Sequence, residues 1–388
     1  MNDVSDHSRA QVAPPEILAD LAAKAGVCFN GSNPWDIQVL DAAVYRRILS
    51  QGSLGLGESY MDGLWECAAL DELFTRLLSA DIEQKLGGMA RLKLLFEAIR
   101  QNIVNRQKRA RAYEVGERHY DIGNEIFAAM LDPTMSYSCG YWVNADNLIE
   151  AQIAKLDLIC RKLELKPGEK VLDIGCGWGG FARYAAEQYG VSVDGITVSK
   201  EQQQLAQKRC EGFPVTIKLQ DYRELSGEYD KIVSIGMFEH VGPKNYPTFF
   251  DTALRLLKDD GLFLLHSIGL DRTTANGDPW IDKYIFPNGK IPSAAQLSKA
   301  LDRRFIIEDW HNFGPDYDKT VMAWWKRFDD AWDKLSQNKL FQNYDQRFYR
   351  MWKYYLHCSA GFFRSKNGQL WQLVLAKRDR PGRYYSIR

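Results

Sequence analysis

The pattern of apolar and polar positions changes character near residue 165. Between residues 15 and 110, apolar residues recur at helical spacing. Loops such as GSNPWDI and QGSLGLGESYMDGLW interrupt this pattern, and their glycines and Pro34 are expected to break any continuous helix. The pattern therefore predicts a small, mainly helical N-terminal domain.

Beyond Leu165 the pattern alternates between strands and helices. The strand-like runs are KVLDIGCG, VSVDGITV, VTIKLQDY, YDKIVSIG and GLFLLHSIG. Amphipathic segments separate several of them, namely WGGFARYAAEQYG, SKEQQQLAQKRCEG and FFDTALRLLKDDG. Such alternation is typical of the α/β class, in which helices cover both faces of a parallel sheet.

The last part of the chain is rich in aromatic residues. It contains two predicted helices, at residues 317–335 and 344–363, and a closing strand, LWQLVLAKR. The preceding segment, residues 271–315, is rich in Pro, Gly and Asn and lacks clean periodicity, so it is expected to cover the carboxyl ends of the strands. We place the domain boundary at the basic stretch that ends near Gly116, which gives domains 1–116 and 117–388.

The composition is that of an ordinary globular protein, with 388 residues, 45% apolar and 26% charged. No segment has the apolar length of a membrane helix, and the polar first residues do not resemble a secretory signal, so a cytoplasmic protein is expected. The seven cysteines are scattered without a CxxC pair, and we expect neither a disulfide framework nor a metal site.

Fifty basic and fifty acidic residues cancel overall, but basic residues gather between positions 91 and 118. Apolar residues recur there at roughly helical spacing, which is the pattern of a basic helix that binds an anionic lipid surface. The same pattern fits a helix that packs its apolar face on a neighbouring domain. The pattern alone leaves both interpretations open.

The segment DIGCGWGG has glycines at GxGxxG spacing, at positions 175, 177 and 180. The motif is weak by itself, but here it follows a predicted strand and opens a predicted helix, as a nucleotide-like ligand requires. A dinucleotide site would place a carboxylate at the tip of the next strand. Thr197 occupies that tip and Asp194 lies inside the strand, which argues against NAD.

These motifs, with YSCGYW, ITVSKEQ, QDY, SIGMFEHVG and LGESYMDGLWE, resemble the cyclopropane-fatty-acyl-phospholipid synthases and the related mycolic acid cyclopropane synthases. The likeness covers nearly the whole chain. It implies a Rossmann-like class I methyltransferase fold that binds S-adenosyl-L-methionine as co-substrate. The residues that it implies around this molecule are Tyr137, Ser138, Asp173, Gly175, Cys176, Gly177, Trp178, Gly179, Thr197, Ser199, Gln202, Asp221 and Tyr222.

Three candidate catalytic side chains follow strands of the predicted sheet, Glu239, His266 and Tyr317. The residues alone show only a carboxylate, an imidazole and a phenol that can converge, and His266 or Tyr317 would otherwise read as core. The resemblance implies a bound bicarbonate that acts as base. Its implied ligands are Cys139, Glu239, His266, Tyr317 and the backbone of Ile268.

The resemblance implies transfer of a methylene group to the cis double bond of an unsaturated acyl chain in a membrane phospholipid. It also implies a homodimer at the inner face of the cell membrane, without a nucleic-acid partner. Two alternatives remain: a lipid C-methyltransferase that leaves a methyl branch or an alkene, and a catalytically silent protein that binds lipid or S-adenosylmethionine.

Overall fold

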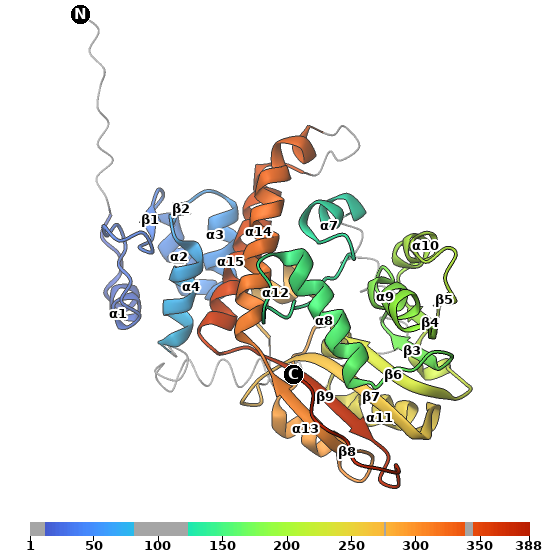
Figure 1. The fold of residues 1–388 in the computed structure, drawn as a ribbon. Helices are drawn as coiled ribbons and strands as arrows, with labels where there is room; N and C mark the ends of the chain where they lie inside the picture. The colour runs from blue at the N-terminus through green and yellow to red at the C-terminus, as the bar shows by residue number, and fades with distance from the viewer. Residues whose placement is uncertain (1–11, 81–122, 275–276, 338–343) are drawn as a thin grey trace, which may run out of the picture.

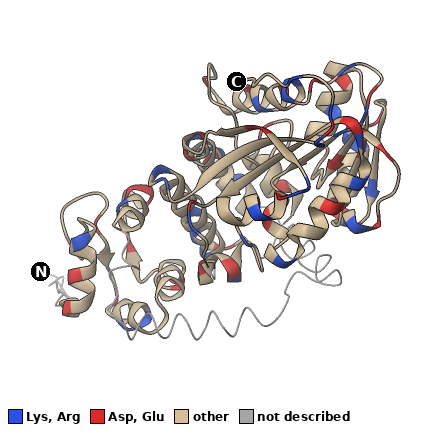
Figure 2. Ribbon diagram, turned by 90° about the horizontal axis from the view of Figure 1, so that it is seen from below, with Lys and Arg blue, Asp and Glu red and all other residues tan. Residues whose placement is uncertain are grey.

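The computed structural model describes residues 12–80, 123–274, 277–337 and 344–388 (Figure 1). The predicted basic helix at 91–118 and the boundary near Gly116 lie outside these residues, so both stay predictions. None of the described helices combines the length and the apolar character that crossing a membrane demands. Basic and acidic residues are both spread over the described chain (Figure 2).

A seven-stranded sheet with the order β5-β4-β3-β6-β7-β9-β8 forms the centre of the molecule. Strands β3, β4, β5, β6 and β7 run parallel, and β9 pairs antiparallel with both β7 and β8. The strands are β3 (Lys170–Ile174), β4 (Ser192–Thr197), β5 (Val215–Leu219), β6 (Tyr229–Ile235), β7 (Leu257–Gly269), β8 (Ile306–Asn312) and β9 (Gln369–Ala376). The predicted α/β class is confirmed.

Helices cover both faces of this sheet. On one face the apolar sides of α8 (Leu148–Lys162) and α9 (Gly180–Tyr189) pack on the strands. On the other face lie α11 (Tyr246–Leu256) and α13 (Ala294–Leu301). The central strands are buried on both sides, which is why their sequences read as continuous apolar runs. Helix α10 (Lys200–Arg209) connects β4 to β5.

The prediction for residues 271–315 needs correction. This segment contains regular elements, α12 (Pro279–Tyr284), α13 and β8. Only its first part reaches the carboxyl ends of the strands, where Pro287 and Asn288 line a cavity. Strand β8 lies at the edge of the sheet and is mostly half-buried, so its sequence IIEDWHN lacks the apolar run of a central strand.

The N-terminal part is mainly helical, as predicted, with a two-stranded sheet of β1 (Gln38–Val39) and β2 (Trp65–Glu66). Its helices are α1 (Glu16–Lys24), α2 (Ala43–Gln51), α3 (Ser53–Met61) and α4 (Leu70–Ser79). The expected loop at QGSLGLGESYMDGLW was wrong, because α3 runs through it. A β-carbon on Gly55 would collide with the Arg47 carbonyl of α2, and one on Gly57 would collide with the Trp280 ring of α12. These glycines permit close packing instead of breaking the helix.

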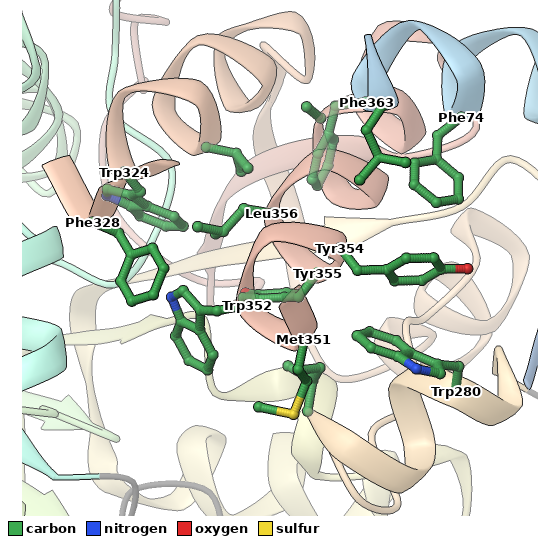
Figure 3. Close-up of a cluster of buried hydrophobic side chains, with 14 of the residues drawn as sticks. Phe74, Trp280, Trp324, Phe328, Met351, Trp352, Tyr354, Tyr355, Leu356 and Phe363 are labelled. Atoms are coloured by element: carbon green, nitrogen blue, oxygen red, sulfur yellow. The ribbon is translucent and has the colours of Figure 1, made fainter. Parts of the chain in front are cut away.

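One aromatic core joins the N-terminal helices to α12, α14 (Pro315–Ser336) and α15 (Gln346–Arg364), next to the short helix α7 (Asn124–Met130) (Figure 3). The Tyr354 ring of α15 lies 4.5 Å from that of Trp280 and 4.9 Å from that of Phe74. The Arg364 guanidinium donates to Asp71 of α4 at 2.7 Å and to Asp318 of α14 at 2.9 Å. The N-terminal helices therefore pack directly on the helices that follow the sheet.

The contact between α3 and α12 leads to a prediction of stability. Changing a helical glycine to alanine usually stabilises a protein by up to about 1 kcal/mol. At Gly57 we expect the opposite, a loss of about 1–3 kcal/mol, because the new methyl group must displace the buried Trp280 ring. Chemical denaturation of Gly57→Ala measures this loss. A variant as stable as the parent would contradict the close packing of Gly57 against the Trp280 ring.

Candidate active site

A cavity opens at the carboxyl ends of β3, β4 and β6, around the loop that joins β3 to α9. Gly175, Gly177 and Gly179 of this loop have positive φ angles of 86°, 54° and 79°. A β-carbon on Gly175 would also lie 2.6 Å from the Met237 side chain. The residues predicted around S-adenosylmethionine that line this cavity are Tyr137, Ser138, Asp173, Gly175, Cys176, Gly177, Trp178, Thr197, Gln202, Asp221 and Tyr222.

Two predicted residues, Gly179 and Ser199, are not among those that line the cavity. Gly179 precedes α9, where a β-carbon would lie 2.9 Å from the Cys210 sulfur. The Ser199 hydroxyl caps α10 by accepting the Gln202 amide proton, at 3.3 Å between nitrogen and oxygen. Gly179 therefore lies at the start of α9, and Ser199 lies at the start of α10. In this structure both residues help to shape the cavity without lining it.

Polar groups at the tips of β4 and β5 face the cavity. The Thr197 hydroxyl donates to the side-chain oxygen of Gln202 at 2.9 Å, which leaves the Gln202 amide nitrogen for a ligand. The buried Asp221 carboxylate accepts two bonds from the Arg223 guanidinium, at 2.8 and 2.6 Å. Tyr222 lies edge-on to Phe249, with ring centres 5.3 Å apart. This side of the cavity offers an amide and an aromatic ring.

The opposite wall carries two buried ionisable residues, Asp173 and Lys155. Burial raises the pKa of Asp173 to about 7, and Lys155 opposes that rise. The Lys155 ammonium donates to the Ser138 hydroxyl at 3.0 Å, and burial lowers the pKa of Lys155 to about 8. Lys155 belongs to none of the sequence motifs and was not predicted as a site residue. A usable signal was its place on α8 three residues after Gln152, on the face that also carries Leu156 and Ile159.

Glu239 lies in the turn that follows β6, and His266 and Ile268 lie near the end of β7. The Ile268 amide donates to one oxygen of Glu239 at 2.7 Å, so in this structure Ile268 orients Glu239. The second oxygen, Oε2, is buried and has no hydrogen-bond partner among the described residues. Burial raises the pKa of Glu239 to about 7.

His266 is buried two residues before Ile268 along β7. Its Nδ1 atom lies 3.3 Å from the Gln372 amide nitrogen of β9. Its Nε2 atom is buried without a hydrogen-bond partner in the described part of the chain. Burial, with Lys155 and Lys162 nearby, holds the pKa of His266 well below its usual range, so the imidazole is neutral.

The remaining two predicted catalytic residues lie on neighbouring segments. Cys139 is fully buried next to Ser138, and the Thr320 hydroxyl of α14 donates to its sulfur at 3.8 Å. Burial raises the pKa of the Cys139 thiol well above its usual value, which disfavours a nucleophilic role. Tyr317, in the first turn of α14, stacks on Phe363 with ring centres 4.3 Å apart.

None of the five predicted catalytic residues is among those that line the cavity. Three residues that line the cavity connect it to the predicted catalytic residues. Ser138 precedes Cys139, His240 follows Glu239, and the Gly236 amide donates to the His266 carbonyl at 2.9 Å. Burial lowers the pKa of His240 to about 4, so a neutral imidazole lines the cavity. Other lining residues that the sequence motifs did not indicate include Arg223, Met237, Asn245, Pro287 and Asn288.

The sequence profile of the family described as mycolic acid cyclopropane synthetase matches residues 107–373. The chain belongs to this family. It is 54% identical over 361 residues to the cyclopropane-fatty-acyl-phospholipid synthase of Escherichia coli (strain K12), which covers 93% of both chains. It is also 32% identical over 357 residues to the tuberculostearic acid methyltransferase UfaA1 of Mycobacterium tuberculosis, covering 87% of this chain and 82% of that protein.

Solved structures support the same assignment. The cyclopropane synthase MmaA2 from Mycobacterium tuberculosis superposes with a TM-score of 0.63 at 33% identity, covering 68% of this chain and 98% of that one. The mycolic acid cyclopropane synthase CmaA1, solved with SAH, gives a TM-score of 0.62 at 33% identity, with the same coverage. This member of the family is an S-adenosylmethionine-dependent enzyme of the methyltransferase type.

The fold extends beyond the family. Coclaurine N-methyltransferase, at 23% identity, superposes with a TM-score of 0.66 and covers 83% of this chain and 99% of that one. That likeness shows the shared methyltransferase fold alone. Any chemistry particular to cyclopropane formation must therefore come from side chains that the family places on this fold.

Proposed function

We propose that this family member transfers a methylene group from S-adenosylmethionine to the cis double bond of an unsaturated acyl chain in a phospholipid, forming a cyclopropane. The observation that carries the proposal is the pair of buried, unpaired atoms, Glu239 Oε2 and His266 Nε2, beside the cavity. The 54% identity to a phospholipid synthase along 93% of each chain supports the choice of acceptor.

The proposed reaction has two steps, transfer of the methyl group and closure of the ring. The electron pair of the double bond forms a bond to the sulfonium methyl group, and sulfur keeps the electrons of its broken bond, giving S-adenosylhomocysteine. The neighbouring carbon becomes a cation. A base then takes a proton from the new methyl group, and the freed C–H pair closes the ring.

The protein must hold the alkene against the methyl group and exclude water, which would trap the cation as an alcohol. Aromatic side chains border the cavity at this point. The Tyr137 hydroxyl is hydrogen-bonded to that of Tyr355 at 2.7 Å, and the Phe286 ring lies 5.9 Å from those of Tyr355 and His240. These rings would disfavour water on this side of the proposed reaction site.

Bicarbonate fits the donor set behind the cavity. Its one O–H group can donate a hydrogen bond to a carboxylate oxygen such as Glu239 Oε2, and its other oxygen atoms can accept a hydrogen bond from His266 Nε2. Tyr317 and Cys139 complete the proposed ligands. Held there, bicarbonate would supply the base for the methyl proton. Glu239 and His266 would keep it in place, because each is fixed by a bond from the sheet.

Removal of bicarbonate tests this assignment. In buffer freed of carbon dioxide, we expect turnover to fall about tenfold or more, because general-base catalysis typically contributes at least that much. Added bicarbonate should restore the rate, whereas acetate should not. Binding of S-adenosylhomocysteine should stay unchanged in both buffers. An unchanged rate without bicarbonate would remove it from the mechanism.

Product analysis tests the function itself. Purified protein, S-adenosylmethionine and vesicles of a monounsaturated phospholipid should yield acyl chains that have gained one CH₂ and resist ozonolysis. A second candidate is a lipid C-methyltransferase, favoured by the 32% identity to a tuberculostearic acid methyltransferase. It would give a methyl branch or an ozone-sensitive alkene. No change in the lipid, with co-substrate still bound, would indicate a silent binding protein.

We further propose peripheral attachment to the inner face of the cell membrane, and a homodimer. The support for attachment is the run of basic residues between positions 100 and 111. Co-sedimentation with anionic vesicles should weaken with added salt, and also with charge reversal at Lys108, Arg109 and Arg111. Co-sedimentation that is indifferent to both changes would contradict the attachment. Sedimentation equilibrium measures the oligomeric state.

A further inference from the structure

Lys155 is a fully buried lysine in the wall of the proposed cofactor cavity, on helix α8. Its ammonium donates to the Ser138 hydroxyl at 3.0 Å. One turn earlier, the buried Gln152 amide donates to the Ser138 carbonyl at 2.8 Å. Two polar side chains of α8 thus hold the segment that brings Ser138 to the cavity and Cys139 to the site behind it.

Lys155 has anionic neighbours, Asp173 and Asp132. The two carboxylates differ in the other hydrogen bonds that they accept. The Asp132 carboxylate accepts the backbone amides of Thr134 at 2.8 Å and Ser136 at 3.1 Å. Asp173 is also buried, but its Oδ1 atom has no hydrogen-bond donor within the described chain. A buried carboxylate without donors either takes up a proton or depends on a nearby cation.

The charge of the ligand explains why a lysine in this wall must have a carboxylate near it. S-adenosylmethionine carries a sulfonium, an ammonium and one carboxylate, so its net charge is positive. A lone buried ammonium would repel it. Near Asp173, however, the carboxylate offsets the positive charge of the Lys155 ammonium, and it stays available to the positive groups of the ligand.

We propose that Lys155 is a positioning residue of the cofactor cavity, which keeps the Asp173 carboxylate ionised for the cationic co-substrate and holds Ser138 in the wall. The inference rests on the proposed cofactor site. It does not depend on the acyl acceptor, so binding can be measured without any lipid.

The other titratable groups around the pair do not supply this charge. Cys176, on the loop after β3, and Cys210, at the end of α10, face Asp173, but burial raises the pKa of both thiols and keeps them neutral. Behind Lys155, Cys139 is a protonated thiol and His266 a neutral imidazole, because burial shifts the pKa of each away from the charged form.

The sign of the expected pH dependence follows. With Lys155 present, the pKa of Asp173 is about 7, so the affinity for a cationic ligand should rise with pH through 7 and then level off. Without the ammonium, the pKa of Asp173 should move upward, because an opposite charge no longer favours the carboxylate. The rise in affinity should then occur at higher pH.

The experiment is calorimetric titration of the full-length protein with S-adenosylmethionine, without lipid, between pH 6 and 8.5. In Lys155→Met we expect affinity about tenfold weaker than the parental value at pH 7.5, with the loss shrinking as the pH is raised. In Asp173→Asn the pH dependence near 7 should vanish. This second variant keeps the proposal testable even where Lys155→Met does not fold.

Lys162→Met is the matched control. Lys162 lies on the same helix and is equally buried, but it pairs with Asp309, at 3.2 Å, and is not among the residues that line the cavity. Its loss should lower stability and leave the pH profile of binding unchanged. Lys155→Met binding that weakens equally at every pH, or does not weaken, would overturn the proposal, as would an unaltered profile in Asp173→Asn. A shifted profile in a protein that makes no cyclopropane would refute the proposed function alone.

Discussion

Glu239→Gln is expected to lower kcat for cyclopropane formation about a hundredfold to a thousandfold, with little change in the affinity for S-adenosylmethionine. The amide keeps the size of the side chain and can still accept the Ile268 backbone proton. It loses the charge and the second acceptor, the buried Oε2 atom that is proposed to hold the base. Steady-state kinetics with vesicles and calorimetry without lipid separate the two effects.

Glu187→Gln is a suitable control for this result. Glu187 is a half-exposed carboxylate on α9 that pairs only loosely with Arg183, at 3.9 Å. Its replacement should leave both kcat and cofactor affinity at parental values. If Glu239→Gln turned lipid over at the parental rate, or if its loss of rate were matched by an equal loss of cofactor affinity, the role assigned to Glu239 would be wrong.

Trp352→Ala is expected to lower the free energy of unfolding by about 3–5 kcal/mol. Trp352 of α15 is completely buried, and its ring lies 5.4 Å from that of Tyr355 and 6.1 Å from that of Phe127 (Figure 3). Its indole nitrogen donates to the Met130 sulfur at 3.3 Å. The truncation leaves a cavity where α7, α14 and α15 meet.

Trp325→Ala tests whether this loss reflects burial. Trp325 of α14 belongs to the same group of rings but is only partly buried, so less of its surface returns to water when it is truncated. Denaturant titration should give a clearly smaller loss for Trp325→Ala than for Trp352→Ala. Equal losses would mean that Trp352 does not occupy the centre of this core.

The parts of the fold that the sequence predicted are those whose patterns are local. The central strands are apolar throughout because both faces are covered, and the glycine loop requires positive φ angles that only its own residues determine. Helix α3 and strand β8 were not predicted, because they depend on contacts with residues that are distant in the chain. The glycines of α3 make room for Trp280, and β8 is an edge strand stabilised by pairing with β9.

The same distinction applies to the site. The resemblance indicated the residues on motifs, and the structure brings most of the predicted cofactor residues to one cavity. The resemblance could not indicate Lys155, because a lysine on a helix is usually solvated and only the packing of α8 buries this one. Nor could motif membership separate Ser199, which caps a helix, from Gln202, which lines the cavity.

Transfer of a deuterated methyl group tests the central claim most directly. With S-adenosylmethionine carrying a CD₃ group, and vesicles of a monounsaturated phospholipid, we expect the product acyl chain to gain CD₂ and to survive ozonolysis intact. One deuterium is lost because the base removes it from the new methyl group before the ring closes. A product that retains all three deuterium atoms, or one that ozone cleaves at the site of transfer, would contradict cyclopropane formation by this protein.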